Sequence, residues 1–163
     1  MAEFPANPSR LDPYKASSFR VKWDGRYVAA IIRVSPLVRE TAAVAERSGG
    51  DPTDQHVSPG STTWPSIVLE RGRTQDTAFE DWANFVWDDG KMSLKNLRKE
   101  VTIELEDEQG AVVMAFVVHR AWPTEYVALG QLDASSEETL VERLTLAHEG
   151  WERDTSVRDP VET

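Results

Sequence analysis

The residues of this chain that could do chemistry are its carboxylates and histidines, because it contains no cysteine. Glu104 and Glu106 stand close to Asp107 and Glu108, and paired carboxylates of this kind can serve as general acid and base. The same residues surround a turn between two expected strands, where a charged, solvated hairpin tip is the simpler interpretation. The histidines are far apart in sequence and lack the H-E-x-x-H spacing of zinc proteases; they are His56, His119 and His148.

Tryptophans offer a second candidate site. Trp82 and Trp87 could stack on a flat ligand, but both fall on an expected amphipathic helix, where packing in a core or an interface is the usual role of tryptophan. His119 ends an apolar run and His148 lies in an expected strand, so we interpret both as structural. Phosphate-binding glycine loops and the G-x-S-x-G nucleophile motif are absent from the sequence. We therefore expect no enzyme, no cofactor and no metal site.

The length, charge and composition of the chain disfavour several other classes of protein. The chain has 163 residues, the size of a single domain, and a net charge of −10. This charge disfavours specific nucleic-acid binding, because phosphate contacts need a basic surface. The longest apolar run, 111–118, is too short to span a bilayer as a helix, and residues 1–8 lack the pattern of a signal peptide. The absence of cysteine fits a cytosolic protein, and we expect no membrane anchoring.

Alternating residues predict two half-buried strands with charged outer faces, over 19–23 and 101–106. The turn Asp24-Gly25 links the first of them to a strand over 26–34, which is apolar on both faces and is expected to be covered on both sides. Further strands are expected at 64–70, 111–118 and 143–149. The polar residues of the two alternations are Arg20, Lys22, Thr102, Glu104 and Glu106.

One helix is expected, over 77–88. Thr77 and Glu80 have the spacing of a capping box, and Gly90 follows as a stop signal. The apolar positions recur with the helical period and predict a single buried stripe, formed by Phe79, Trp82, Ala83 and Val86. The opposite face is acidic, with Glu80, Asp81, Asp88 and Asp89.

Residues 37–63 have little that could anchor a core. The stretch 41–45 is small or β-branched, and 48–63 is rich in glycine, proline, serine, threonine and aspartate. Loops longer than about a dozen residues are uncommon unless they are functional or disordered. We expect 48–63 to be an extended loop that projects from the domain, the other interpretation being a disordered surface loop.

Together these patterns predict a mainly β fold, in which two packed antiparallel sheets carry one flanking helix and a long loop. We expect a single domain over 1–163, with an N-terminal arm at 1–16 and a C-terminal tail at 155–163. A domain with this many strands leaves sheet edges open, and proteins either block such edges or pair them. A ring of subunits joined edge to edge would close them, so we expect an oligomer.

An ordered set of segments gives the chain a family resemblance. It is similar to the tail-tube proteins of contractile phage tails and of extracellular contractile injection systems, from about residue 12 to residue 154. The segments that carry the resemblance are 19–28, 58–60, 69–72, Thr74, Asp76, 79–84, Trp87, 93–95, 98–100, Trp122, 125–126, 132–134 and 149–154. The stretch 41–45 and the tail 155–163 are the least family-like parts.

The resemblance implies a structural function. It implies two packed sheets with a flanking helix, hexameric rings stacked into an inner tube within a contractile sheath, and one sheet of each subunit joined into a continuous barrel around a lumen for cargo. The implied partners are further copies of the chain, the sheath protein, baseplate and cap proteins, and a cargo effector. Assembly in a bacterial or archaeal cytoplasm, followed by incorporation into an injection particle, is the corresponding location. No catalytic residues are implied.

Three sets of residues are expected at assembly surfaces. Contacts between stacked rings are assigned to Glu46, Arg47, Asp51, Asp54 and Pro59. A salt-sensitive contact with the sheath is assigned to the acidic helix face named above. The channel wall should not hold its cargo, so it should lack a large apolar patch, and the polar faces of the two alternating strands are its candidates. An acidic lumen is favoured by the net charge.

Two other functions are also compatible with the sequence. One is a baseplate-proximal initiator or adaptor with the same fold, which would form single rings. The other is a monomeric β-barrel that binds a ligand. The state of self-association would separate them.

Overall fold

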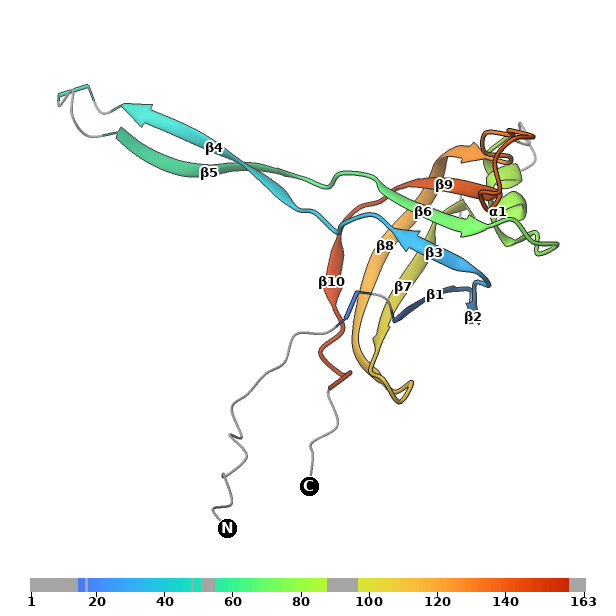
Figure 1. Cartoon of the computed structure of the whole chain (residues 1–163). Coiled ribbons are helices and arrows are strands. Elements are labelled where there is room, and N and C mark those ends of the chain that lie inside the picture. The colour runs from blue at the N-terminus through green and yellow to red at the C-terminus, as the bar shows by residue number, and fades with distance from the viewer. Residues whose placement is uncertain (1–14, 17, 48, 51–54, 88–96, 159–163) are drawn as a thin grey trace, which may run out of the picture.

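A folded antiparallel sheet and a projecting two-stranded arm make up the protein (Figure 1). The computed structural model describes residues 15–16, 18–47, 49–50, 55–87 and 97–158. The helix is α1 (Ala78–Trp87). The strands are β1 (Phe19–Trp23), β2 (Arg26–Tyr27), β3 (Ile31–Val34), β4 (Glu40–Arg47), β5 (Gln55–Thr63), β6 (Ile67–Gly72), β7 (Lys99–Glu106), β8 (Val112–Val127), β9 (Val141–Ala147) and β10 (Trp151–Arg153).

Strand β8 connects the two layers of the fold. Eight strands form one sheet in the order β2-β1-β7-β8-β9-β6-β3, with β10 also paired to β8. The first part of β8 pairs with β7 and β10, and the part from Trp122 onward pairs with β9. Arg120 lies at the change of partner with a φ of 51°, a left-handed conformation that bends the strand. We call β2-β1-β7-β8-β10 the first sheet and β8-β9-β6-β3 the second sheet.

The architecture confirms the expected mainly β fold of packed antiparallel sheets with one helix. The sheet ends at β2 and β3 and is not a closed barrel. Apolar side chains from both layers meet in one core, which includes Val21, Trp23, Ile67, Leu69, Val101, Ile103, Val118, Leu144 and Leu146. No helix in the described part of the chain is long and apolar enough to cross a membrane.

Helix α1 closes one end of the core with two aromatic side chains. Phe79 and Trp82 are buried, and the Trp23 ring lies 5.9 Å from the Phe79 ring and 4.9 Å from the Trp82 ring. The Trp82 Nε1–H donates to the Leu97 carbonyl at 2.8 Å, which satisfies its buried polar group. The predicted stripe is therefore confirmed at these positions, but Val86 is exposed because the last turn of the helix extends past the core.

The start of α1 differs from the expected capping box. The Thr77 hydroxyl donates to the Asp81 carboxylate at 2.9 Å instead of capping the backbone near Glu80. The Asp76 carboxylate accepts the Ala78 N–H at 2.8 Å, and it provides a charged acceptor at the positive end of the helix. An aspartate one position earlier has thus taken the place of the threonine.

The single strand expected over 26–34 is two strands. The chain turns at Ala29 and Ala30, where Ala30 has a φ of 61°, so that β2 stays in the first sheet while β3 crosses to pair with β6. This crossing leaves the Ile32 side chain 54% exposed, and the expectation that both faces are covered is wrong for the isolated chain.

Two features of the C-terminal half were not predicted. Strand β8 continues through its bend to Val127, well beyond the run expected at 111–118. Strand β10 follows Gly150, whose φ is 127° and where an added Cβ would lie 3.1 Å from the Trp64 ring. A glycine is needed there both for the backbone conformation and for the close approach of the ring.

A buried ion-pair network joins the second sheet to α1. Arg71 on β6 and Glu142 on β9 are directly opposite and both 0% exposed, and the Arg71 Nε–H donates to the Glu142 carboxylate. Arg71 Nη2 donates to the Asp76 carbonyl at 2.5 Å. Arg73 and Tyr126 both donate to the second oxygen of Glu142, at 2.6 and 2.9 Å. Nearly every hydrogen-bonding position of this carboxylate is therefore occupied.

The arm consists of β4 and β5, which pair only with each other (Figure 1). Part of the loop expected at 48–63 is thus the regular strand β5. Every residue of the two strands is exposed except Ser58, which is half-buried. The Thr41 and Thr62 hydroxyls meet at 3.0 Å near the base of the arm. Isolated two-stranded hairpins are marginally stable in water, so this arm calls for a partner surface.

Candidate functional site

The two polar strand faces predicted from the sequence lie together on one face of the first sheet. Arg20 is directly opposite Glu104, and Lys22 is opposite Thr102. Because residues opposite each other in a sheet share a face, all five expected lumen residues belong to one surface, with the apolar residues of both strands on the core side. We call this surface the charged face; it comprises Arg20, Lys22, Thr102, Glu104 and Glu106.

The charges of this face are paired. The Lys22 Nζ lies 2.9 Å from Glu104 Oε1, Arg20 forms an ion pair with Glu106, and the Tyr27 hydroxyl donates to Glu104 Oε2 at 2.8 Å. Glu104 is only 6% exposed, and its burial favours the neutral acid. The hydrogen bonds from Lys22 and Tyr27 outweigh this burial and hold the pKa of Glu104 below its usual value. The hydrogen bond with Glu104 in turn raises the pKa of Lys22.

The charged face continues across β8 to β10 through a histidine. His119 Nδ1 lies 2.6 Å from the Glu100 carboxylate on β7, and Nε2 lies 3.0 Å from the Glu152 carboxylate on β10. Burial lowers the pKa of His119, but the two carboxylates more than offset it, so that the pKa of the imidazole is raised above its ordinary value. The sequence alone favours a structural role for this histidine and gives no sign of the pairing, because Glu100 and Glu152 are far from His119 along the chain.

Strand β10 is one edge of the first sheet, and the short β2 together with the start of β1 is the other; the Val28 N–H donates to the Val21 carbonyl at 2.8 Å, so β1 is open only before Val21. Strand β10 pairs only with β8, and β1 pairs with β7 and, at Lys22 and Trp23, with the short β2. In antiparallel pairing alternate residues point their backbone groups outward. The backbone N–H of His119 donates to the Gly150 carbonyl, and the backbone N–H of Asp154 donates to the Ala115 carbonyl. The backbone groups of Trp151 and Arg153, which alternate with these, therefore point away from β8. In the part of the chain that the structure describes, no strand covers this edge.

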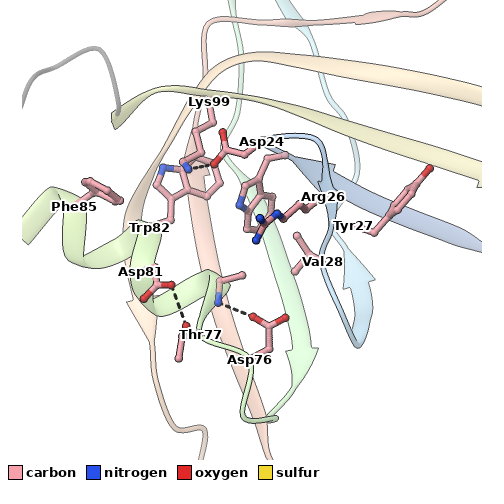
Figure 2. Close-up of a pocket in the computed structure, with 12 residues that line it drawn as sticks. Asp24, Arg26, Tyr27, Val28, Asp76, Thr77, Asp81, Trp82, Phe85 and Lys99 are labelled. Carbon is pink, nitrogen blue, oxygen red and sulfur yellow. Dashed lines mark hydrogen bonds and ion pairs between the residues drawn. The ribbon is translucent and has the colours of Figure 1, made fainter.

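A groove of about 530 Å³ lies between α1 and the turn after β1 (Figure 2). Its wall includes Trp82 and Phe85, and Lys99 forms an ion pair with Asp24 at its rim. Its remaining carboxylates, Asp76 and Asp81, make the hydrogen bonds at the start of the helix. Within the described ranges, no three acidic or histidine side chains are placed to hold a metal ion. The groove therefore offers no free acid–base pair.

The family model described as T4-like virus tail tube protein gp19 matches residues 15–152, which is most of the chain. The chain belongs to this family. It is a tail-tube protein, a structural subunit of a phage-tail-like tube, and the monomeric ligand-binding barrel is not favoured.

Solved structures show the same fold. A chain of the anti-feeding prophage cap, described as the tube-terminating cap, is 24% identical over 95% of this chain and 99% of its own length, with a TM-score of 0.77. A chain of the sheath/tube terminator of an extracellular contractile injection system, PVC, is 22% identical over 90% and 100%, with a TM-score of 0.78. A chain of the PVC sheath-tube complex is 22% identical over 90% and 94%, with a TM-score of 0.76. No curated protein matches the sequence.

The residues assigned to ring stacking in this tail-tube protein fall partly on the arm. Glu46 is opposite His56, Arg47 is opposite Gln55, and Pro59 is opposite Ala43. All three assigned residues are exposed. The other two, Asp51 and Asp54, lie outside the described residues. The structure thus brings Glu46, Arg47 and Pro59 together on one projecting element.

The outer surface of α1 is less purely acidic than the sequence predicts. Asp81 is exposed and Glu80 is half-buried, while Asp88 and Asp89 lie outside the described residues. The end of the helix exposes Phe85, Val86 and Trp87, of which Trp87 is 83% exposed. A partner of this tail-tube protein on this side would therefore meet apolar as well as acidic groups.

Proposed function

We propose that this tail-tube protein forms hexameric rings that stack into the inner tube of a contractile injection system, with a lumen through which cargo passes. The family match over 15–152 carries the proposal, and the open edges of the first sheet support it. The partners we propose are further copies of the chain, a contractile sheath protein, baseplate and cap proteins, and a cargo effector. The similar solved chains come from structures described as a baseplate, a cap and a sheath-tube complex.

Ring closure in this proposal is edge-to-edge pairing of the first sheet. The outward backbone groups of β10 in one copy would bond those that β2 leaves free at the start of β1 in the next copy, and the pairing would repeat around the ring. The β10 edge and the edge formed by β2 and the start of β1 lie on opposite sides of the first sheet, as this repeat requires (Figure 1). Edge pairing satisfies backbone donors and acceptors that otherwise invite aggregation.

The charged face is the proposed wall of the lumen. It lies on the side of the first sheet opposite the core, so a closed ring of first sheets would turn it toward the channel. Its ion pairs compensate one another, and β8 adds the buried Ala115 and the half-buried Val117 to the same face. Such a wall offers cargo neither a large exposed apolar patch nor a strong field of one sign. We propose a passive, non-catalytic role for these residues. Assembly in the cytoplasm of a bacterium or archaeon, before incorporation into the injection particle, is part of the same proposal.

Replacing Arg153 with proline should block ring closure without unfolding the subunit. The Arg153 N–H points away from β8, so its loss removes a donor only from the free edge, where proline is tolerated. Sedimentation velocity should show subunits for Arg153→Pro and rings or larger assemblies for the unaltered protein. The matched control is Arg158→Pro, which lies beyond β10 and should assemble normally. Rings formed by Arg153→Pro with unchanged stability would show that β10 is not the joining edge.

The β4–β5 arm is the proposed contact between stacked rings. It begins beside the free edge, because the Trp151 indole N–H donates to the Val38 carbonyl at 3.2 Å and the Trp151 ring lies 5.8 Å from the Trp64 ring. Its exposed, small and apolar residues include Ala43, Ala45 and Val57, which would be covered in a stack. The acidic part of α1 remains the proposed contact with the sheath.

Shortening the arm should separate ring formation from stacking. Removing residues 42–61 and joining Thr41 to Thr62 through an Asn-Gly turn keeps the pair at the base, and this turn matches the twist of paired strands. Because the arm adds nothing to the core, the shortened protein should keep its melting temperature. Electron microscopy should show rings but no tubes. Long tubes from the shortened protein would rule out the arm as the stacking contact.

A further inference from the structure

The bend in β8 is built around a β-bulge that a single carboxylate supports. Lys99 is opposite Ala121 and Val101 is opposite Val118, so Glu100 alone on β7 faces both His119 and Arg120 on β8. Glu100 Oε1 accepts the Arg120 N–H at 3.2 Å, and Oε2 lies 2.6 Å from His119 Nδ1. The carboxylate therefore bonds a backbone donor within the bulge and orients the imidazole next to it.

The other side of the imidazole reaches the edge strand. His119 Nε2 lies 3.0 Å from Glu152 Oε1, and Glu152 lies between Trp151 and Arg153, whose outward groups form the free edge. Backbone bonds support the same junction, since His119 donates to the Gly150 carbonyl at 2.8 Å and Glu149 donates to the His119 carbonyl at 3.0 Å. The histidine thus ties β7, β8 and β10 together at one point.

The positions of the two carboxylates favour the doubly protonated form of the His119 imidazole. An ionised carboxylate only accepts hydrogen bonds, and a neutral imidazole has one N–H. A neutral His119 could therefore satisfy Glu100 or Glu152 but would turn a lone pair toward the other, whereas the imidazolium donates to both. Among the described residues, Arg120 also adjoins His119 in the chain and Glu149 adjoins it through a backbone hydrogen bond, and they pair with each other at 2.7 Å, so their charges offset each other.

We propose that Glu100, His119 and Glu152 form a proton-dependent clamp that holds β10 at the bend of β8, so that rings of this protein close less readily as pH rises and His119 loses its proton. The effect on rings rests on the proposed function, whereas the clamp is a property of the subunit. The raised pKa of His119 fixes the sign: the clamp is complete below about pH 6.5, the ordinary value for histidine, and is lost as pH rises through the higher value of the folded protein. The channel wall would then contain a pH sensor next to the joining edge.

Histidine-specific and backbone hydrogen exchange, both read by mass spectrometry between pH 5.5 and 9, test the clamp on the full chain. We expect His119 to titrate above its ordinary pKa. Exchange rates are corrected for the intrinsic effect of pH, and the β3 peptide serves as the reference. As His119 deprotonates, the protection factor of the β10 peptide should fall by about two- to five-fold relative to that of the β3 peptide. This range corresponds to the contribution of partly exposed ion pairs. In Glu152→Gln the amide can donate to a neutral imidazole, so this pH dependence should largely disappear. His56→Gln, on the exposed arm, is the matched control and should keep it.

Three results would contradict the proposed clamp. A His119 that titrates at its ordinary pKa, or β10 protection whose ratio to β3 does not change with pH in the unaltered protein, contradicts it. So does a Glu152→Gln protein that keeps the full pH dependence. Sedimentation over the same pH range tests the consequence for rings. If rings form at no pH, the proposed function fails, while the exchange measurements still decide the clamp.

Discussion

Replacing Glu142 with alanine should lower the free energy of unfolding by about 3–5 kcal/mol, because it leaves the fully buried Arg71 cation without its carboxylate. The same change removes the acceptor shared by Arg73 and Tyr126. Urea unfolding followed by tryptophan fluorescence measures the loss. The exposed Glu138→Ala is the matched control and should change stability by less than about 0.5 kcal/mol.

A double replacement separates the burial of charge from the loss of packing. Arg71→Met combined with Glu142→Leu removes both charges and keeps apolar volume, so it should be far less destabilising than Glu142→Ala alone. If Glu142→Ala unfolds at the same urea concentration as the unaltered protein, the Arg71–Glu142 pair is not the buried link between β6 and β9 described above.

Replacing Trp82 with alanine should cost about 3–5 kcal/mol of stability. The side chain is 1% exposed, packs 4.9 Å from the Trp23 ring and donates a hydrogen bond to Leu97, so its removal leaves both a cavity and an unpaired carbonyl. Trp87→Ala is the natural control, since it removes the same residue type from the same helix where the side chain is 83% exposed.

The comparison of these tryptophans tests the placement of α1. We expect a large fall in melting temperature for Trp82→Ala and almost none for Trp87→Ala. The Trp87→Ala protein should also still assemble into tubes at low temperature. Equal effects of the two replacements would mean that the helix does not present its predicted stripe to the core.

Much of the fold could be predicted from the local periodicity of the sequence. The apolar spacing of Phe79 and Trp82 predicted the buried face of the helix, and the alternation of Arg20 with Val21 predicted which side of β1 is polar. What alternation alone could not show is that the polar sides of β1 and β7 are the same surface. That depends on the register of Arg20 against Glu104, which joins residues far apart in the chain.

The features missed from the sequence have no local signal. Arg120 bends β8 in a left-handed conformation without a glycine or proline, so the sequence predicts a strand that ends with the apolar run. Arg71 and Glu142 resemble ordinary surface charges until the pairing of β6 with β9 buries them opposite each other. The arm was expected as a loop because small and polar residues, including Pro59 and Gly60, weaken strand propensity, while cross-strand pairing still orders them.

A cryo-EM reconstruction of the particles formed by the purified protein would show directly whether this chain builds a tube and which surface faces its channel. We expect stacked hexameric rings in which β10 of each copy pairs with the start of β1 of the next, and in which Arg20, Lys22, Glu104 and Glu106 line the channel. A protein that stays monomeric at high concentration, or a tube whose channel is lined by another surface while the charged face points outward, would contradict this expectation.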